Sequence, residues 1–284
     1  MKQDIDPSRN YFHVITQALN KKDALPSLPA IVFDIRRALV DNDTTNTQLA
    51  NLVKQDVGLT ALLLKTASSP LYRTSVPAVS IKQVIARLGM KTVGHLVFVH
   101  SLKGMFNLKS TGLEPLFNYV SKRQSCMAGL STYLAMKLLY PYTDQVMIAS
   151  ILSEVGNLAI LAAFKDSSYI LEPKIYFALC RKYGKSIGTV LLNRWKIDQE
   201  IIDALKGYGK WKQTDHENLC LVDILNLAKY HTAFLIKKDP VLPPLSELAA
   251  FIHIPPDLNE TKDGMELLLV ADHRDLILEI IEGL

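Results

Sequence analysis

The residues that could bind a metal ion or act as nucleophiles are few and scattered in this chain of 284 residues. Seven histidines and three cysteines occur, with no His-Asp dipeptide, no pair of histidines four residues apart and no Cys-x-x-Cys. His95 and His100 are five residues apart, so on a helix they point in different directions. The cysteines are Cys126, Cys180 and Cys220. Their odd number and wide spacing argue against a disulfide framework and a zinc knuckle, so we expect small buried hydrophobic residues.

One short motif is similar to the end of a phosphate-binding loop. Gly184-Lys185-Ser186 has the right residue types, but position 179 is Leu where the motif needs Gly. An apolar helical pattern also precedes it where a strand is required. We therefore reject a nucleotide-binding P-loop here.

The elements that must position any site are predicted to be helices. Apolar residues recur at three- and four-residue spacing almost throughout, which favours an all-α fold. Thr45-x-x-Gln48 and Ser80-x-x-Gln83 fit capping boxes, and Gly89 is typical of a helix end. Further helices are expected over 91–105, 116–139, 145–164, 175–183, 187–195, 199–206 and 219–236, with two closing helices after Pro244 and Pro256.

A break in pattern at Asn107 to Pro115 predicts two packed helical subdomains. We expect an N-terminal extension at 1–24, an N-terminal helical bundle at 25–110 and a C-terminal bundle with the closing helices at 111–284. The longest apolar run, Leu158 to Phe164, is far shorter than the roughly 20 residues of a membrane-spanning helix. The N-terminus resembles neither a signal nor a transit peptide. We expect a cytoplasmic protein that does not enter a membrane.

The net charge of +4 is unevenly distributed. From Ala61 to Tyr140 ten basic residues stand against one acid, whereas Gln213 to Leu284 holds thirteen acids and five bases. Such asymmetry permits an anionic partner, and equally permits the two segments to face each other within one molecule or across a homodimer. The candidate contacts for an anion or a partner are Arg73, Lys82, Arg87, Lys91, Lys210, Trp211 and Lys212. Trp195 is expected to be a core residue.

Several segments, in order, resemble one family. LPSLPAIVFDIRRAL, TTNTQLANLVKQDVGLTALLLKTASSPLY and VSIKQVIARLGMKTVGHLV from Leu25 onward, and SIGTVLLNRWKIDQEIIDAL further on, are similar to motifs of the HDOD family, the HD-related output domains of bacterial signalling proteins. The similarity covers about Leu25 to Tyr230. It implies an all-helical fold related to HD-domain phosphohydrolases, whose metal ligands are histidines and aspartates.

The resemblance also shows where those ligands would lie, and this chain has other residues there. Ser153 and Glu154 stand in place of the His-Asp pair. The other positions are Gln124, Ser186, Gly207, Tyr208 and Lys229. Hydroxyl, amide and ammonium groups do not replace imidazole and carboxylate ligands, and a lysine adds positive charge. We therefore expect no metal ion, no cofactor and no catalytic residue, with Glu154 paired to a base such as Lys229.

The resemblance implies a non-catalytic signalling module that acts through contacts with other signalling proteins. Two alternatives stay open. One is a metal-dependent phosphohydrolase of the HD superfamily with a non-standard site. The other is binding of nucleotides or nucleic acid through the basic segments at 61–140 and 181–212, where Tyr208 and Trp211 could stack on bases.

Overall fold

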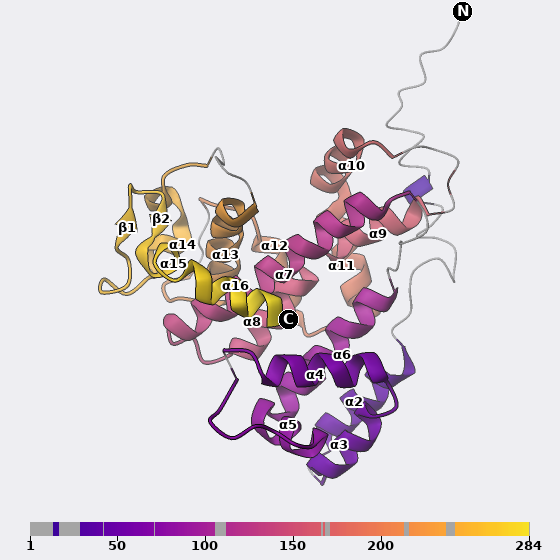
Figure 1. Cartoon of the computed structure of the whole chain (residues 1–284). Helices are drawn as coiled ribbons and strands as arrows, with labels where there is room; N and C mark the ends of the chain where they lie inside the picture. The colour runs from indigo at the N-terminus through magenta and orange to yellow at the C-terminus, as the bar shows by residue number, and fades with distance from the viewer. Residues whose placement is uncertain are drawn as a thin grey trace, which may run out of the picture.

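The computed structural model describes residues 14–16, 29–41, 43–70, 72–105, 112–165, 167, 171–212, 216–236 and 242–283. The first helices gather together at the bottom of Figure 1. They are α2 (Ala30–Val40), α3 (Asn46–Val53), α4 (Val57–Ala67), α5 (Ile81–Leu88) and α6 (Met90–Met105). The α6 helix packs on α2, α4 and α5, and it also contacts α8, so it connects this group to the rest of the fold.

Local sequence explains where these helices begin and end. Thr45 and Gln48 form the expected capping box at the start of α3. At α5, the Ser80 side chain accepts from the Gln83 amide, but the Gln83 side chain accepts from the Val79 amide, so only half of the second box forms. Gly89 ends α5 with a φ of 82°, which glycine adopts without strain.

The remaining helices surround α7 (Glu114–Lys137), which packs on α8, α13 and α16. They are α8 (Thr143–Leu152), α9 (Val155–Ala163), α10 (Pro173–Leu179), η1 (Cys180–Gly184), α11 (Lys185–Arg194), α12 (Gln199–Gly207), α13 (Leu221–Ile236), η2 (Leu245–Glu247), α14 (Ala249–Ile252), α15 (Leu268–Ala271) and α16 (Arg274–Gly283). The fold is all-α, as predicted. Its division into two subdomains at residue 110 stays a prediction, and residues 106–111 lie outside the described residues.

The structure differs from the expected helices at three places. The helix expected over 145–164 is broken at Ser153 and Glu154 into α8 and α9. The two helices expected over 175–195 are joined without a break by η1, a π-helical turn. The closing segment after Pro256 contains a small antiparallel hairpin, β1 (Thr261–Lys262) and β2 (Glu266–Leu267), before α15 and α16. Strands of two residues are too short to show an alternating pattern.

A long segment of high mean hydropathy lies inside the fold. Gln145–Ala163 has the length and mean hydropathy (1.9) of a membrane-crossing helix, but 72% of it is buried within the chain, and the core helix of a folded domain passes the same test. Trp195 is buried and meets the ring of Phe98 edge-on at 6.3 Å, so it is the core residue that was expected. Cys126 is buried, but Cys180 and Cys220 are only half-buried, so the expectation for these two was wrong.

Candidate functional site

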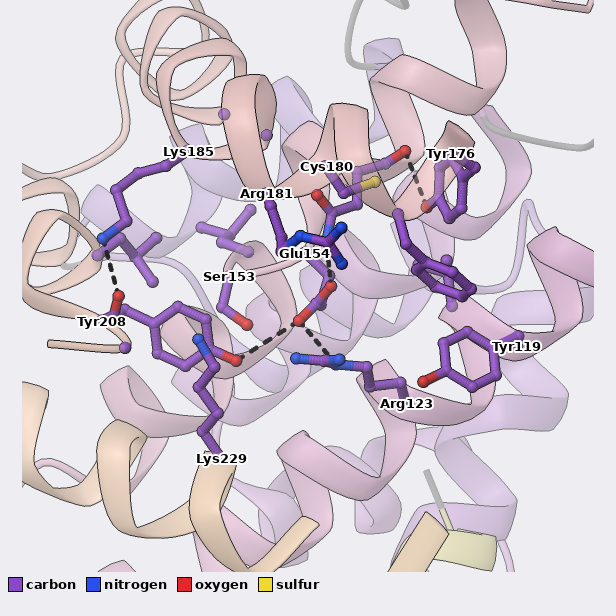
Figure 2. A pocket seen from close by; sticks show the side chains of 18 of the residues that line it. Tyr119, Arg123, Ser153, Glu154, Tyr176, Cys180, Arg181, Lys185, Tyr208 and Lys229 are labelled. Atoms are coloured by element: carbon purple, nitrogen blue, oxygen red, sulfur yellow. Dashed lines mark hydrogen bonds and ion pairs between the residues drawn. The ribbon is translucent and has the colours of Figure 1, made fainter. Parts of the chain in front are cut away.

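A cavity of about 920 Å³ lies where α7, the α8–α9 junction, the helix from α10 to α11, the end of α12 and α13 meet. Its walls are partly apolar and include Tyr119, Tyr176 and Phe177. Its lining carries four cationic side chains, Arg123, Arg181, Lys185 and Lys229, and one acidic side chain, Glu154. Figure 2 shows these side chains arranged around Glu154. The cavity therefore has an excess of positive charge, and its size is in the range of small-molecule sites.

Glu154 is the centre of the polar groups in this cavity (Figure 2). The break between α8 and α9 places it just before the first residue of α9, and only 2% of the residue is exposed. Its Oε1 lies 3.0 Å from Arg123 Nε and accepts from the Tyr208 hydroxyl at 3.4 Å, while its Oε2 accepts from the Asn157 side chain. The carboxylate is therefore already paired with a cation inside the protein.

Burial and the charge of Glu154 shift the pKa values of the neighbouring groups. The carboxylate of Glu154 raises the pKa of Arg123 above its ordinary value, despite the opposite effect of burial. Burial raises the pKa of the Tyr208 phenol, and the charge of Glu154 acts in the same direction. Burial also raises the pKa of the Cys180 thiol to about 12, so this lining cysteine is a protonated thiol and a poor nucleophile at neutral pH.

Lys229 reaches the cavity from α13 without a carboxylate partner among the described residues. Its Nζ lies 4.0 Å from the centre of the Tyr208 ring and 5.6 Å from that of Trp211. Burial lowers the pKa of Lys229 to about 8, against the attraction of Glu154. Gly209, with a φ of 83°, leaves room for the ammonium group, because a Cβ there would lie 2.5 Å from Nζ. Glu154 is therefore paired with a base, as expected, but its ion-pair partner is Arg123 and not Lys229.

The helix from α10 to α11 supplies the opposite wall. It approaches α9 so closely that a Cβ on Gly156 would lie 1.8 Å from the carbonyl oxygen of Gly184, in the π-helical turn η1. Lys185 follows this turn, and its Nζ donates to the carbonyl oxygens of Tyr208 (2.8 Å) and Lys206 (3.2 Å). Burial lowers the pKa of Lys185, and the nearby charge of Lys210 adds to the effect. Turns of π-helix are often found at functional sites.

The structure brings together four of the seven positions at which metal ligands were sought. Ser153, Glu154, Tyr208 and Lys229 line the cavity. Gln124 is buried beside it and donates to the Ile151 carbonyl oxygen at 2.8 Å. Ser186 is exposed, and Gly207 ends α12 against Val222. In each of these three cases a chain neighbour lines the cavity instead: Arg123, Lys185 and Tyr208.

The predicted surface contacts do not line this cavity. Arg73 is exposed in the segment between α4 and α5, and Lys82 is exposed on α5. The side chain of Lys91 is outside the described part of the structure. Arg87 donates to the carbonyl oxygens of Val76 and Ala67, so it stabilises the local fold. Lys210 and Lys212 are exposed in the loop after α12, where Lys212 pairs with Glu247 at 3.0 Å.

Trp211 of the same loop is half-buried. It packs edge-on against Tyr230 with ring centres 6.2 Å apart. Trp211 is therefore only partly accessible, and its role as a contact for an anion or a partner stays a prediction. The ring faces inward, toward the Lys229 ammonium group.

The donor groups of the cavity do not fit the metal centre of an HD phosphohydrolase. Such a centre needs several carboxylate and imidazole ligands, and among the described residues the lining holds one carboxylate and no histidine. That carboxylate is bound by Arg123, and Lys229 would place a second cation beside any ion. The cavity is suited to an anionic ligand instead.

Sequence reasoning missed Arg123, Arg181 and Lys185 as members of the site. Arg123 and Lys185 are the immediate neighbours of Gln124 and Ser186, so an error of one helical position hid both of them. The sequence observation that pointed to this wall was the basic segment at 181–212, which holds eight basic and three acidic residues.

Comparisons with known proteins agree with this architecture. Residues 25–208 match the HDOD domain family. A crystal structure from Shewanella amazonensis, whose name assigns it provisionally to the metal-dependent phosphohydrolases, aligns with a TM-score of 0.76 at 19% identity, over 97% of this chain and 99% of that one. An HDOD protein of unknown function from Geobacter sulfurreducens aligns with a TM-score of 0.66 at 21% identity, over 97% of both chains.

An uncharacterized protein of Treponema pallidum is 21% identical over 233 residues, which is 77% of this chain. The aligned region is 44% of the length of that relative, so the chain spans less than half of it. The helical fold, with its cavity between α7, α9 and α13, defines the chain as an all-α protein. Within that class, the match over 25–208 shows that the chain belongs to the HDOD family.

Proposed function

We propose that this chain is a non-catalytic signal-transduction module of the HDOD type that acts by binding other signalling proteins in the cytoplasm. The observation that carries the proposal is the ion pair between Glu154 and Arg123 at 3.0 Å. Glu154, the one acid in the described lining of the cavity, is neutralised by the protein itself, so it is not available to hold a catalytic ion. The proposed partners are other signalling proteins or a second copy of this chain.

The alternative, a metal-dependent phosphohydrolase, makes a different prediction for a simple assay. We expect the purified chain to hydrolyse bis(p-nitrophenyl) phosphate no faster than a protein-free blank containing Mn²⁺, Mg²⁺ or Fe²⁺. The matched variant is Glu154→Gln, which removes the one carboxylate of the cavity. Hydrolysis above the blank that disappears in this variant would overturn the proposal.

A second function is supported by Lys229. A largely desolvated ammonium group without a carboxylate partner costs stability, and groups with strongly shifted pKa values cluster at ligand-binding and catalytic sites. We propose that the cavity binds a small phosphorylated ligand, with Lys229 and Arg181 facing its charge and the aromatic wall of Tyr119, Tyr176 and Phe177 facing its apolar part. Nucleotides, which the sequence left open as ligands, belong to this class of phosphorylated compound, and we propose this cavity as their binding site.

Calorimetric titration with pyrophosphate, ATP and cyclic diguanylate tests this second function. We expect at least one of the three to bind, more weakly at higher salt because the contacts are ionic. Lys229→Met should weaken that binding by about tenfold or more, which is at least about 1.4 kcal/mol. The control is Lys182→Met, because Lys182 is exposed and lies over the Tyr183 ring without lining the cavity. Equal loss in both variants, or no binding of any probe at low salt, contradicts the proposal.

A further inference from the structure

A second cluster of chemically active side chains lies away from the cavity, around the first turn of α13. His216 and Cys220 lie in the segment before the helix, and Asp223 lies in its first turn. Their potential ligand atoms all lie within 4.8 Å of one another. His216 Nε2 is 3.2 Å from Asp223 Oδ2. An imidazole, a thiol and a carboxylate therefore converge on one point.

A fourth residue holds the carboxylate in place. His253, at the end of α14, places its Nδ1 2.9 Å from Asp223 Oδ2, and its side chain is only 6% exposed. The same oxygen accepts from the Cys220 backbone amide at 3.1 Å. The Asp223 side chain is 3% exposed, whereas that of His216 is 22% exposed, so the cluster is closed on the protein side and open to solvent at one histidine.

We propose that His216, Cys220 and Asp223 form a binding site for a divalent transition-metal ion of the Zn²⁺ type, with His253 as a positioning residue for the Asp223 carboxylate. The proposal departs from the expectation, drawn from the sequence, that the chain binds no metal ion. It concerns residues other than those that line the cavity.

The donor types and their separations fit such an ion. Nitrogen, sulfur and carboxylate oxygen together are typical zinc ligands, whereas Mg²⁺ and Ca²⁺ prefer oxygen alone. Zinc bonds of about 2.0–2.3 Å in a tetrahedral arrangement place ligand atoms about 3.3–3.8 Å apart. The potential ligand atoms are up to 4.8 Å apart in the structure, and side-chain movements of about 1 Å would bring them into that range. On binding, the Cys220 thiol loses its proton to solvent and the thiolate coordinates the ion.

His253 contacts the proposed metal ligand Asp223 and not the ion itself, as residues around the ligands of metal sites commonly do. A hydrogen bond from a second side chain fixes the orientation of the coordinating group and raises its affinity for the ion. Here the partner comes from α14, and the ligands come from α13 and the segment that precedes it. A bound ion would therefore join α13, α14 and the loop after α12.

Spacing alone did not reveal this cluster. His216-x-x-x-Cys220-x-x-Asp223 matches no common zinc motif, and His253 lies thirty residues beyond Asp223 in the sequence. The four residues meet because α13 packs on α14.

The test uses the full chain without a histidine tag, stripped with a chelator and titrated with Zn²⁺ by calorimetry. We expect one equivalent to bind, with Mg²⁺ unable to compete at tenfold excess. Cys220→Ser and His216→Gln should each weaken binding by about 100-fold or more, and His253→Gln by about 10–100-fold, the range found for outer partners of metal ligands. Circular dichroism verifies that each variant is folded.

Substitution with Co²⁺ provides a second, spectroscopic readout. We expect a thiolate-to-cobalt charge-transfer band that disappears in Cys220→Ser and persists in Cys180→Ser, the control at another half-buried cysteine. Absence of Zn²⁺ binding by the stripped chain would overturn the proposal. A cobalt band that survives in Cys220→Ser would overturn it as well.

Discussion

Lys229 allows a quantitative test of the cavity, because its burial is costly at neutral pH. A pKa of about 8 in place of the ordinary 10.5 corresponds to about 3 kcal/mol at about 1.4 kcal/mol per pH unit. Lys229 is partly exposed and its ammonium group interacts with the Tyr208 ring, so the recoverable part is smaller. We expect Lys229→Met to raise the free energy of unfolding by about 1–2 kcal/mol at pH 7.

The sign of the pH dependence follows from the same lowered pKa. Below pH 8 the lysine is protonated in both the folded and unfolded states, so the wild-type protein bears the full cost of the buried charge. Between pH 8 and 10.5 the folded state loses the proton while the unfolded state keeps it, and folding becomes more favourable. The advantage of Lys229→Met should therefore be largest below pH 8 and shrink as the pH rises toward 10.5.

Urea denaturation at pH 7 and pH 10 measures both effects, with thermal melting as a second readout. The gain at pH 7 corresponds to an increase in Tm of about 2–5 °C for a chain of this size. Lys182→Met is the control, since Lys182 is exposed and its removal should change stability by less than about 0.5 kcal/mol. A variant that is less stable than wild type at pH 7, or a difference that stays constant from pH 7 to pH 10, would refute the reasoning.

Three further predictions concern other features of the site and the core. Arg123→Met leaves Glu154 buried without its cation and should lower the free energy of unfolding by about 2–3 kcal/mol in urea, a loss that Arg123→Met combined with Glu154→Leu should largely restore. His231 is buried with its pKa lowered to about 3, so stability should fall as the pH drops from 6.5 to 3, and a pH series of melts should show a shallower fall for His231→Leu. Gly156→Ala places a Cβ against the neighbouring π-helical turn and should cost about 3 kcal/mol or more, whereas Gly104→Ala, with nothing within 4 Å, should be neutral or stabilising by thermal melting.

Features that depend on neighbouring residues could be predicted from the sequence. The capping box of Thr45 and Gln48 and the helix end at Gly89 involve only residues within one turn, so their types determine the outcome. The buried position of Trp195 followed from its place at the end of an apolar helix. The all-α class followed from the spacing of apolar residues along the whole chain.

Features that depend on distant residues could be predicted only in part. The resemblance correctly placed Glu154, Tyr208 and Lys229 in one cavity, but the choice of ion-pair partner depended on which face of α7 points inward. Helical periodicity alone does not settle a difference of one residue, and so Gln124 was named where Arg123 lies. The cluster at Asp223 required the packing of α13 on α14, which no local pattern encodes.

The π-helical turn from Cys180 to Gly184 has a consequence for how this family of cavities can vary. A π turn takes about one residue more than an α turn to complete one rotation, so each of its residues rotates the chain less than the roughly 100° of an α-helical residue. Deleting one residue within 182–184 would therefore let the turn close as an α-helical turn while α10 and α11 keep nearly the same relative orientation. The length of this wall can thus change by one residue without turning Tyr176 and Phe177 of α10 away from the cavity.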